Sequence, residues 1–474
     1  MRGLRPILTE ALTEPEMKPR RLARLLLPAA LLAAAATAAA NPYETKLANG
    51  LRVIVKEDHR SPTVVHMVWY RVGAIDEKDG TSGVAHALEH MMFKGTRMVG
   101  PGRFSKLVAA AGGRENAFTN EDYTAYFQLV PKRSLPEMMR LEADRMANLQ
   151  VDPKEFAQEI KVVMEERRMR TEDSPQALVQ ERLNATAFQT HPYRRPVIGW
   201  MDDLERMTWH DVRDWYRRWY APNNAYLVVV GDVTHDEVFR LARKYYGGIK
   251  AQALPERRIE DEPEQLGVKR LVVKAPAKLP YLAMAWKVPR LRDVDRDRDP
   301  YALEVLAAVL DGHDAARLAK NLVREQKIAV SAGAGYDPTL RGEATFILDG
   351  QPADGKTVAE LEAALRAEIR RIQDDGIAVE ELARVKTQAV ASQVYKRDSM
   401  MAQAMEIGGT EATGLRWQDI DTMLDKLRSV TAEEVQAVAR KYFRDDVLTV
   451  ASLDPQPVAD AKPRRSGPAG GPLR

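Results

Sequence analysis

Hydrophobic and polar positions repeat along the chain at a spacing of about 220 residues, which indicates an internal duplication. Two amphipathic segments, 204–220 and 427–443, each end in a basic pair followed by two aromatic residues. Thr208 and Thr431 stand at the same place in the two segments, and each is followed three residues later by an acid. Both threonines therefore predict a helix N-cap with a capping-box partner.

Apolar segments predict strands at matching places in the two copies. Residues 225–230 follow the first helix, and residues 447–451 follow the second. Near the start of each copy, residues 64–69 resemble residues 281–286. Because strands alternate with long helices in both copies, the pattern predicts an α/β fold of the α+β sandwich type.

The repeats divide the chain into a first half, 43–250, and a second half, 268–455, joined by a polar linker, 251–267. A tail, 456–474, is rich in proline, glycine and arginine, and we expect it to be disordered. A leader, 1–40, precedes the first half.

The leader has the pattern of a cleavable signal peptide. From Met17, which is the expected start, basic residues precede a short apolar run, and small residues stand before Asn41. An uncleaved membrane anchor is the alternative. The chain has no cysteine, which excludes disulfides and cysteine-ligated zinc. No later segment is long and apolar enough to predict a stable membrane span, so we expect an exported, periplasmic protein.

The distribution of charge argues against a nucleic-acid partner. The net charge is +3, but the leader and the tail each carry +3, so the body between them carries −3. A nucleic-acid-binding body is expected to be basic, and this one is slightly acidic.

The sequence His-x-x-Glu-His at His86, Glu89 and His90 contains the candidate chemistry. On a helix these three side chains project within one arc of about 100°. Two histidines at i and i+4 can ligate one zinc ion, and the carboxylate beside them can polarise a water molecule. A pair of structural helix histidines near a carboxylate is the alternative.

A third zinc ligand is expected from elsewhere in the chain, because catalytic zinc usually takes three protein ligands. Residues 152–170 form a predicted helix in which Glu159 and Glu166 share the apolar face. The apolar residues of that predicted face are Phe156, Ile160, Val162 and Val163. Carboxylates on a buried face need partners, and a zinc ion with its histidines would supply them. Glu155 and Glu165 fit solvated positions instead.

Several motifs resemble those of the pitrilysin/insulinase family of inverzincin metallopeptidases, in the branch similar to mitochondrial processing peptidase. Glu166 follows His90 by 76 residues, which resembles the family's third-ligand spacing, and Glu159 matches its second acidic position. The other matching segments are 83–96, 116–119, 123–126, 198–199 and 220–225.

The resemblance implies one Zn²⁺ per chain, held by His86, His90 and Glu166. It also implies two catalytic carboxylates: Glu89, which would activate a zinc-bound water, and Glu159, which would orient a ligand.

The resemblance further implies a clamshell of two homologous halves, each a pair of related α/β units. Peptide would add to an exposed edge strand formed by Asn116, Ala117, Phe118 and Thr119.

The second half departs from the family pattern. It has no histidine between residues 236 and 312 and cannot repeat the ligand set in the counterpart helix, expected near residues 301–310. In single-chain members of the family, the corresponding half contains an arginine and a tyrosine seven residues apart. In this chain, Val323 and Val330 stand at those two positions. Arg324 and Tyr336 have the wrong spacing. We therefore expect a dimer, either a homodimer or a heterodimer with a related subunit that lacks the zinc motif.

The prediction is an exported zinc endopeptidase that hydrolyses unfolded peptides or small proteins. A non-catalytic binding or assembly subunit that keeps the fold is one alternative. A metal-dependent hydrolase acting on something other than a peptide is another.

Overall fold

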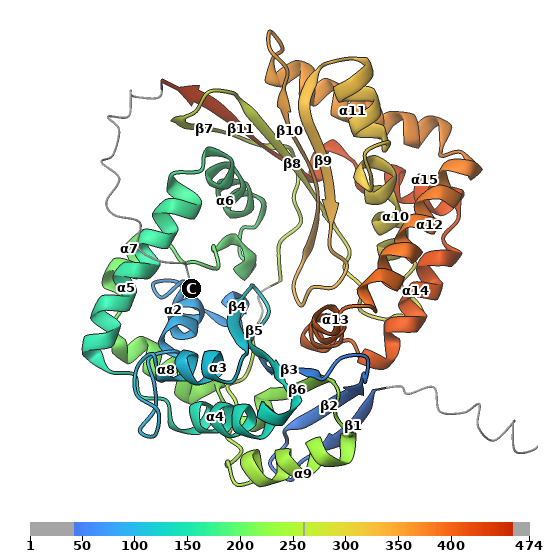
Figure 1. Cartoon of the computed structure of the whole chain (residues 1–474). Helices are drawn as coiled ribbons and strands as arrows, with labels where there is room; N and C mark the ends of the chain where they lie inside the picture. The colour runs from blue at the N-terminus through green and yellow to red at the C-terminus, as the bar shows by residue number, and fades with distance from the viewer. Residues whose placement is uncertain (1–41, 259–260, 458–474) are drawn as a thin grey trace, which may run out of the picture. The chain divides into compact units, whose positions relative to one another are not determined.

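The computed structural model describes residues 42–258 and 261–457 (Figure 1). The leader, with its predicted signal peptide, and most of the predicted tail lie outside the described residues. Within the described part of the chain, no helix is long and apolar enough to cross a membrane.

The first half contains a six-stranded sheet with the order β1-β2-β6-β3-β5-β4. Helices α2 to α9 belong to the same half. The strands are β1 (Tyr43–Lys46), β2 (Arg52–Glu57), β3 (Thr63–Tyr70), β4 (Arg114–Thr119), β5 (Thr124–Pro131) and β6 (Ala225–Gly231). The helices are α2 (Val84–Met91), α3 (Arg103–Ala110), α4 (Leu135–Asn148), α5 (Pro153–Arg167), α6 (Pro175–Ala187), α7 (Met201–Arg206), α8 (Trp209–Trp219) and α9 (His235–Tyr246).

The second half contains a five-stranded sheet with the order β7-β11-β8-β10-β9. Its strands are β7 (Lys269–Pro276), β8 (Tyr281–Val288), β9 (Ala329–Tyr336), β10 (Ala344–Pro352) and β11 (Leu448–Gln456). Its helices are α10 (Asp299–Asp311), α11 (Val358–Asp375), α12 (Val379–Lys396), α13 (Met400–Ala412), α14 (Ile420–Ser429) and α15 (Ala432–Tyr442).

Apart from the additional strand β1, the first sheet has the same topology as the second, which confirms the predicted duplication and the mixed α/β fold. In each sheet one parallel pair, β2 with β6 or β7 with β11, adjoins a run of antiparallel pairs. The order β2-β6-β3-β5-β4 thus recurs as β7-β11-β8-β10-β9. The predicted capping boxes at Thr208 and Thr431 are both present, at the starts of α8 and α15.

Each half contributes one helix that packs on the sheet of the other half (Figure 1). Helix α6 packs on β7, β8 and β11, where its Val179 and Leu183 join a buried cluster of small apolar side chains. Helix α13 packs in the same way on β3 and β6, and its Ile407 lies in a cluster with Trp69 and Tyr226. This exchange buries the second face of each sheet, the face that the half's own helices leave uncovered.

Glycine at position 408 is needed where α13 crosses the first sheet. A Cβ on Gly408 would collide with the buried indole of Trp69, whereas a Cβ on Gly409 would meet no atom within 4 Å. We expect Gly408→Ala to destabilise the protein by about 2 kcal/mol or more, because a buried indole has no free space to move into. Gly409→Ala is the matched control and should be neutral or slightly stabilising, since alanine favours a helix. Thermal unfolding compares the two; equal midpoints would contradict the close packing.

Polar contacts also join the two halves, beside the loop between β9 and β10. The Arg341 guanidinium donates to both carboxylate oxygens of Asp76, at 2.9 and 3.2 Å, and its backbone N–H donates to Asp122 at 2.9 Å. In the predicted linker, Glu262 accepts three backbone N–H groups of residues 189–191 and pairs with Lys287 at 2.7 Å. The segment is therefore tied to both halves at this point.

Candidate metal centre

Helix α2 is fixed at its N-terminus by a buried carboxylate. Glu77 accepts the backbone N–H groups of Gly83 and Ala85, both at 2.9 Å. Burial raises the pKa of Glu77 to about 8, although these two hydrogen bonds oppose the rise. The first turn of a helix has free N–H donors, so this contact sets the position of the helix that contains the histidines.

A close approach of two glycines seats the same helix end. Gly83 and Gly199 have φ angles of +85° and +87°, and a Cβ on Gly199 would lie 2.5 Å from the Ser82 carbonyl oxygen. This contact gives a physical reason for the glycine of the predicted 198–199 motif, since only glycine allows such an approach at positive φ.

We expect Gly199→Ala to destabilise the fold by about 3 kcal/mol and to lower metal retention. Gly80→Ala is the control, because Gly80 has φ +88° but a Cβ added there would meet no atom within 4 Å. Its cost should be only about 1 kcal/mol, from backbone strain alone. Thermal unfolding and zinc content measure the difference, and equal losses would show that the close approach is unimportant.

The structure brings together the three predicted metal ligands. One ligand atom from each of His86, His90 and Glu166 lies within 4.8 Å of the others. Glu166 Oε2 is 3.7 Å from His86 Nε2 and 3.3 Å from His90 Nε2. Helix α2 supplies both histidines and α5 supplies the glutamate, as the two helical patterns predict.

Glu159 lies beside this group and contacts one of its histidines. Its carboxylate is 2.9 Å from His90 Nδ1 and also pairs with Lys94. The contact fixes the ring of His90 so that Nε2 faces Glu166. Glu165, which the sequence assigns to solvent, is exposed and pairs with Arg168, while Glu155 is partly buried at the start of α5.

Burial and charge set opposite proton affinities for the two histidines. Burial is the main cause that lowers the pKa of His86 to about 4, and the nearby His90 lowers it further. Burial also lowers the pKa of His90, but hydrogen bonds to Glu159 and Glu166 outweigh it and raise the value to about 9. The hydrogen bond with His90 holds the pKa of Glu166 below its usual value. The two values favour a proton on His90 and a neutral His86.

The donor set fits a zinc ion. Two imidazole nitrogens and one carboxylate oxygen converge, and this is a common three-ligand set of catalytic zinc sites. Among the described residues, no other group of three such side chains is close enough to hold a metal.

The remaining carboxylate of the motif, Glu89, is held by the predicted substrate strand. Thr119 Oγ1 donates to Glu89 Oε2 at 2.6 Å. Burial raises the pKa of Glu89, and the hydrogen bond from Thr119 opposes this rise. Residues 116–119 lie in β4, which pairs with β5 on one side and forms the edge of the sheet.

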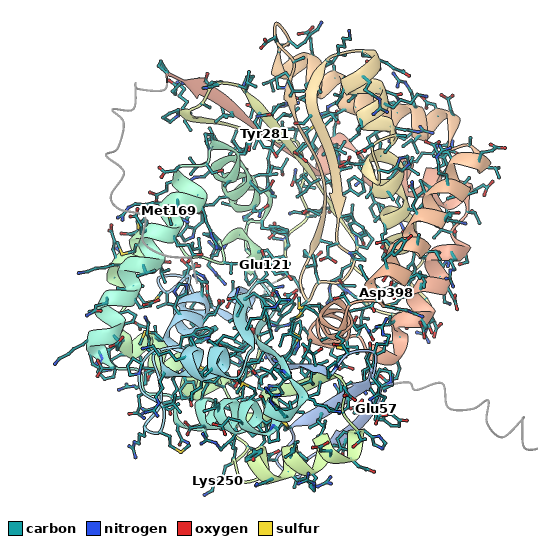
Figure 2. The ribbon with its side chains drawn as sticks, viewed as in Figure 1. Glu57, Glu121, Met169, Lys250, Tyr281 and Asp398 are labelled. Atoms are coloured by element: carbon teal, nitrogen blue, oxygen red, sulfur yellow. The ribbon has the colours of Figure 1, made fainter. Side chains whose placement is uncertain are left out.

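Three contacts in the site do not follow from the sequence pattern: those of Thr119 with Glu89, Lys94 with Glu159, and Arg170 with Glu166. The Arg170 guanidinium lies 2.8 Å from Glu166 Oε1. Arg170 belongs to a turn of π-helix, Arg168–Glu172, that continues α5 and exposes the neighbouring Met169 (Figure 2). Of these three contacts, only that of Arg170 with Glu166 had a sequence signal, which is the i, i+4 spacing of the two residues.

The second half offers no hydrogen-bond donor at the positions of the family's arginine and tyrosine. Val323 packs against the second core, and Val330 is 53% exposed. The two possible substitutes are engaged elsewhere. Arg324 donates to the Asp314 carbonyl at 2.5 Å, and the Tyr336 hydroxyl donates to the Pro289 carbonyl at 2.6 Å.

A zinc-type donor set beside a carboxylate and an open strand edge is typical of metal-dependent hydrolases. The chain belongs to the insulinase family of peptidases, family M16, which confirms the resemblance to pitrilysin and insulinase. The family model described as insulinase (peptidase family M16) matches residues 52–200, and the model described as peptidase M16 inactive domain matches residues 206–389.

Individual relatives agree with this assignment. The zinc protease PqqE of Helicobacter pylori is 31% identical over 417 residues, covering 86% of this chain and 92% of that protein. An uncharacterised zinc protease of Streptomyces coelicolor is 28% identical, covering 84% and 86%. The crystal structure of a protease from Helicobacter pylori superposes with a TM-score of 0.83 at 29% identity, covering 88% of this chain and all of that one.

Proposed function

We propose that this chain is an exported zinc-dependent endopeptidase that hydrolyses unfolded peptides or small proteins. The observation that carries the proposal is the convergence of His86, His90 and Glu166 beside Glu89. The names of the relatives support zinc and proteolysis, and the leader pattern supports export to the periplasm.

The residues of the site have separate tasks in this proposal. A zinc ion held by His86, His90 and Glu166 would supply a Lewis acid and a place for the attacking water. Glu89 would take a proton from the attacking water at Oε1, because Oε2 already accepts the hydrogen bond of Thr119. The raised pKa of Glu89 also suits the return of the proton to the leaving amine.

Strand β4 provides a means of orienting a peptide. Its free edge can pair with an extended substrate backbone, which is recognised independently of side-chain identity. Because β4 ends at Thr119, which contacts Glu89, a peptide bound along this edge passes next to the base. This route favours a peptide substrate over the other hydrolase substrates.

The hydroxyl of Thr119 should matter for catalysis more than for metal binding. We expect Thr119→Val to lower kcat about tenfold, since one hydrogen bond that orients Glu89 is lost. Thr119→Ser keeps the hydroxyl and should restore most of the rate. Steady-state kinetics, with zinc content measured in parallel, tests this role. Equal kcat values for Thr119→Val and Thr119→Ser would contradict it.

The direct test uses the purified full-length chain and a mixture of quenched-fluorescent peptides. We expect cleavage that a chelator abolishes and that stoichiometric zinc restores. A chain that binds zinc and peptide but cleaves nothing, with or without a partner, would favour the non-catalytic binding subunit instead.

We further propose that a related subunit without the zinc motif supplies the missing arginine and tyrosine. The absence of donors at Val323 and Val330 supports this arrangement, and a homodimer that works with zinc alone is the competing one. Affinity purification from the native exported fraction tests it. Full activity of the isolated chain, with no gain from any co-purified subunit, would exclude the heterodimer.

A further inference from the structure

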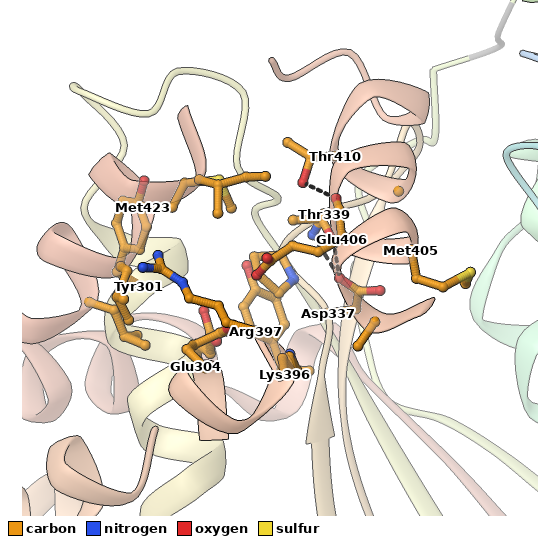
Figure 3. A pocket seen from close by; sticks show the side chains of 18 residues that line it. Tyr301, Glu304, Asp337, Thr339, Lys396, Arg397, Met405, Glu406, Thr410 and Met423 are labelled. Carbon is orange, nitrogen blue, oxygen red and sulfur yellow. Dashed lines mark hydrogen bonds between the residues drawn. The ribbon is translucent and has the colours of Figure 1, made fainter. Parts of the chain in front are cut away.

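A pocket of about 770 Å³ lies within the second half, away from the candidate metal centre. It is lined by α10, α12, α13 and α14 and by the loop after β9, and we call it the second-half pocket (Figure 3). The charged side chains that line it are Glu304, Asp337, Lys396, Arg397 and Glu406.

The second-half pocket is the internal counterpart of the candidate metal centre. Ala87-Leu88-Glu89 of α2 recurs as Ala302-Leu303-Glu304 of α10. Helix α10 packs on α12, α15 and β9 as α2 packs on α5, α8 and β4. In this alignment Glu304 stands where Glu89 stands, while Tyr301 and Val305 replace the two histidines. The second copy therefore has the carboxylate but not the two histidines.

Two carboxylates face the second-half pocket without a partner. Glu304 lies on its floor and Glu406 on the wall formed by α13, and neither side chain has a hydrogen bond or an ion pair with any described residue (Figure 3). Burial raises the pKa of Glu304 to about 7, Asp337 raises it further, and Lys396 opposes the rise. Both carboxylates are partly buried and lack a hydrogen-bonding partner, so a bound cation would stabilise them.

Burial raises the pKa of Glu406, and the nearby Lys396, Lys56 and Arg397 oppose the rise. None of these cations forms a hydrogen bond or salt bridge with Glu406 among the described residues. Arg397 is paired with Asp421, and Asp337 accepts hydrogen bonds from Thr339 at 2.7 and 2.8 Å. Lys396 is exposed at the end of α12 and forms no ion pair within the described residues, so its flexible side chain can keep its charge in water.

The chemistry of the walls selects the kind of cation. The carboxylates are too far apart for three of them to hold one metal ion, since the only such group among the described residues is the one at His86. Met405, Ile420, Met423 and Leu424 supply apolar surface next to the charges. Apolar surface together with carboxylates suits an alkyl stem that ends in a positive charge.

We propose that the second-half pocket binds an organic cation, an ammonium or guanidinium group on an alkyl stem. Such a cation can come from a lysine or arginine side chain of a peptide or from a free alkylamine. The inference does not depend on the proposed peptidase activity, because binding is measured without hydrolysis.

The test titrates the full-length chain with n-pentylamine and, separately, with n-pentanol, using ligand-observed NMR. We expect the amine to bind about tenfold or more tightly than the alcohol, as a charge-assisted hydrogen bond predicts. Glu304→Gln and Glu406→Gln should each weaken amine binding about tenfold and leave alcohol binding unchanged. Glu380→Gln, an exposed substitution on α12 outside the pocket, is the matched control and should change neither.

A second arm distinguishes the sources of the cation. An alanine-rich nonapeptide with one central lysine is added to a Glu89→Gln chain that holds n-pentylamine, and its norleucine analogue serves as the control. Displacement by the lysine peptide alone supports a peptide side chain, and no displacement supports a free amine. Equal binding of amine and alcohol to the wild type would overturn the proposal. The proposal would also be overturned if Glu304→Gln and Glu406→Gln both bound the amine as tightly as the wild type and had wild-type unfolding midpoints.

Discussion

Replacing Glu89 with glutamine is expected to lower peptide hydrolysis by about a thousandfold or more while zinc remains bound. The amide keeps the size of the side chain and can still accept the hydrogen bond of Thr119, but it cannot take a proton from water. Because Glu89 is not among the three converging ligands, the metal donors stay intact. Steady-state kinetics on a quenched peptide, with zinc measured in the same samples, checks both parts.

The control for this variant is Glu165→Gln, which makes the same chemical change at an exposed position of α5. Its activity should match that of the wild type. If Glu89→Gln kept its activity, another group would have to be the base. If it lost zinc together with activity, Glu89 would have to be counted among the groups that hold the metal.

The geometry of helix α2 could be predicted from the sequence because it depends on local spacing. His86, Glu89 and His90 are neighbours on any α-helix, so one helix suffices to place them together. The placement of Glu166 on the same side of α5 as Phe156 follows for the same reason. These predictions needed only the period of the helix and the cost of burying a charge.

The width of the buried face of a helix is set by the elements that pack against it and not by the periodicity of its apolar residues. The predicted apolar face of α5 includes both Val162 and Val163, yet Val163 is fully buried and Val162 is 50% exposed. The elements that pack on α5 cover only the side of Phe156 and Val163. Hydrophobicity alone assigned Val162 to the wrong environment.

The sequence pattern could not predict contacts between distant segments. Thr119 meets Glu89 across 30 residues, and Lys94 meets Glu159 across 65, and no periodicity links either pair. The packing of α13 on the first sheet could not be predicted from the sequence for another reason. Its closest approach uses Gly408, a residue without a side chain to signal burial. Pattern analysis identifies faces of single elements, whereas these features depend on which faces meet.

Replacing Glu166 with glutamine is expected to lower zinc affinity by about a hundredfold or more, and activity should fall with zinc occupancy. Glu166 supplies the only carboxylate oxygen of the three converging ligand atoms, 3.3 Å from His90 Nε2 and 3.7 Å from His86 Nε2. A neutral amide is a weaker ligand for a divalent cation, and the change also removes a negative charge from the site. Competition with a chelator of known affinity measures the loss.

A series of substitutions along α5 separates direct ligation from support. Glu159→Gln should lower zinc affinity less, by about tenfold, because Glu159 contacts His90 Nδ1 and reaches the metal only through that ring. Glu165→Gln, one residue from Glu166 but exposed, should have no effect. The expected order of loss is therefore Glu166, then Glu159, then Glu165. An unchanged affinity in Glu166→Gln would assign the third ligand to another residue, and a larger loss at Glu159 than at Glu166 would exchange their roles.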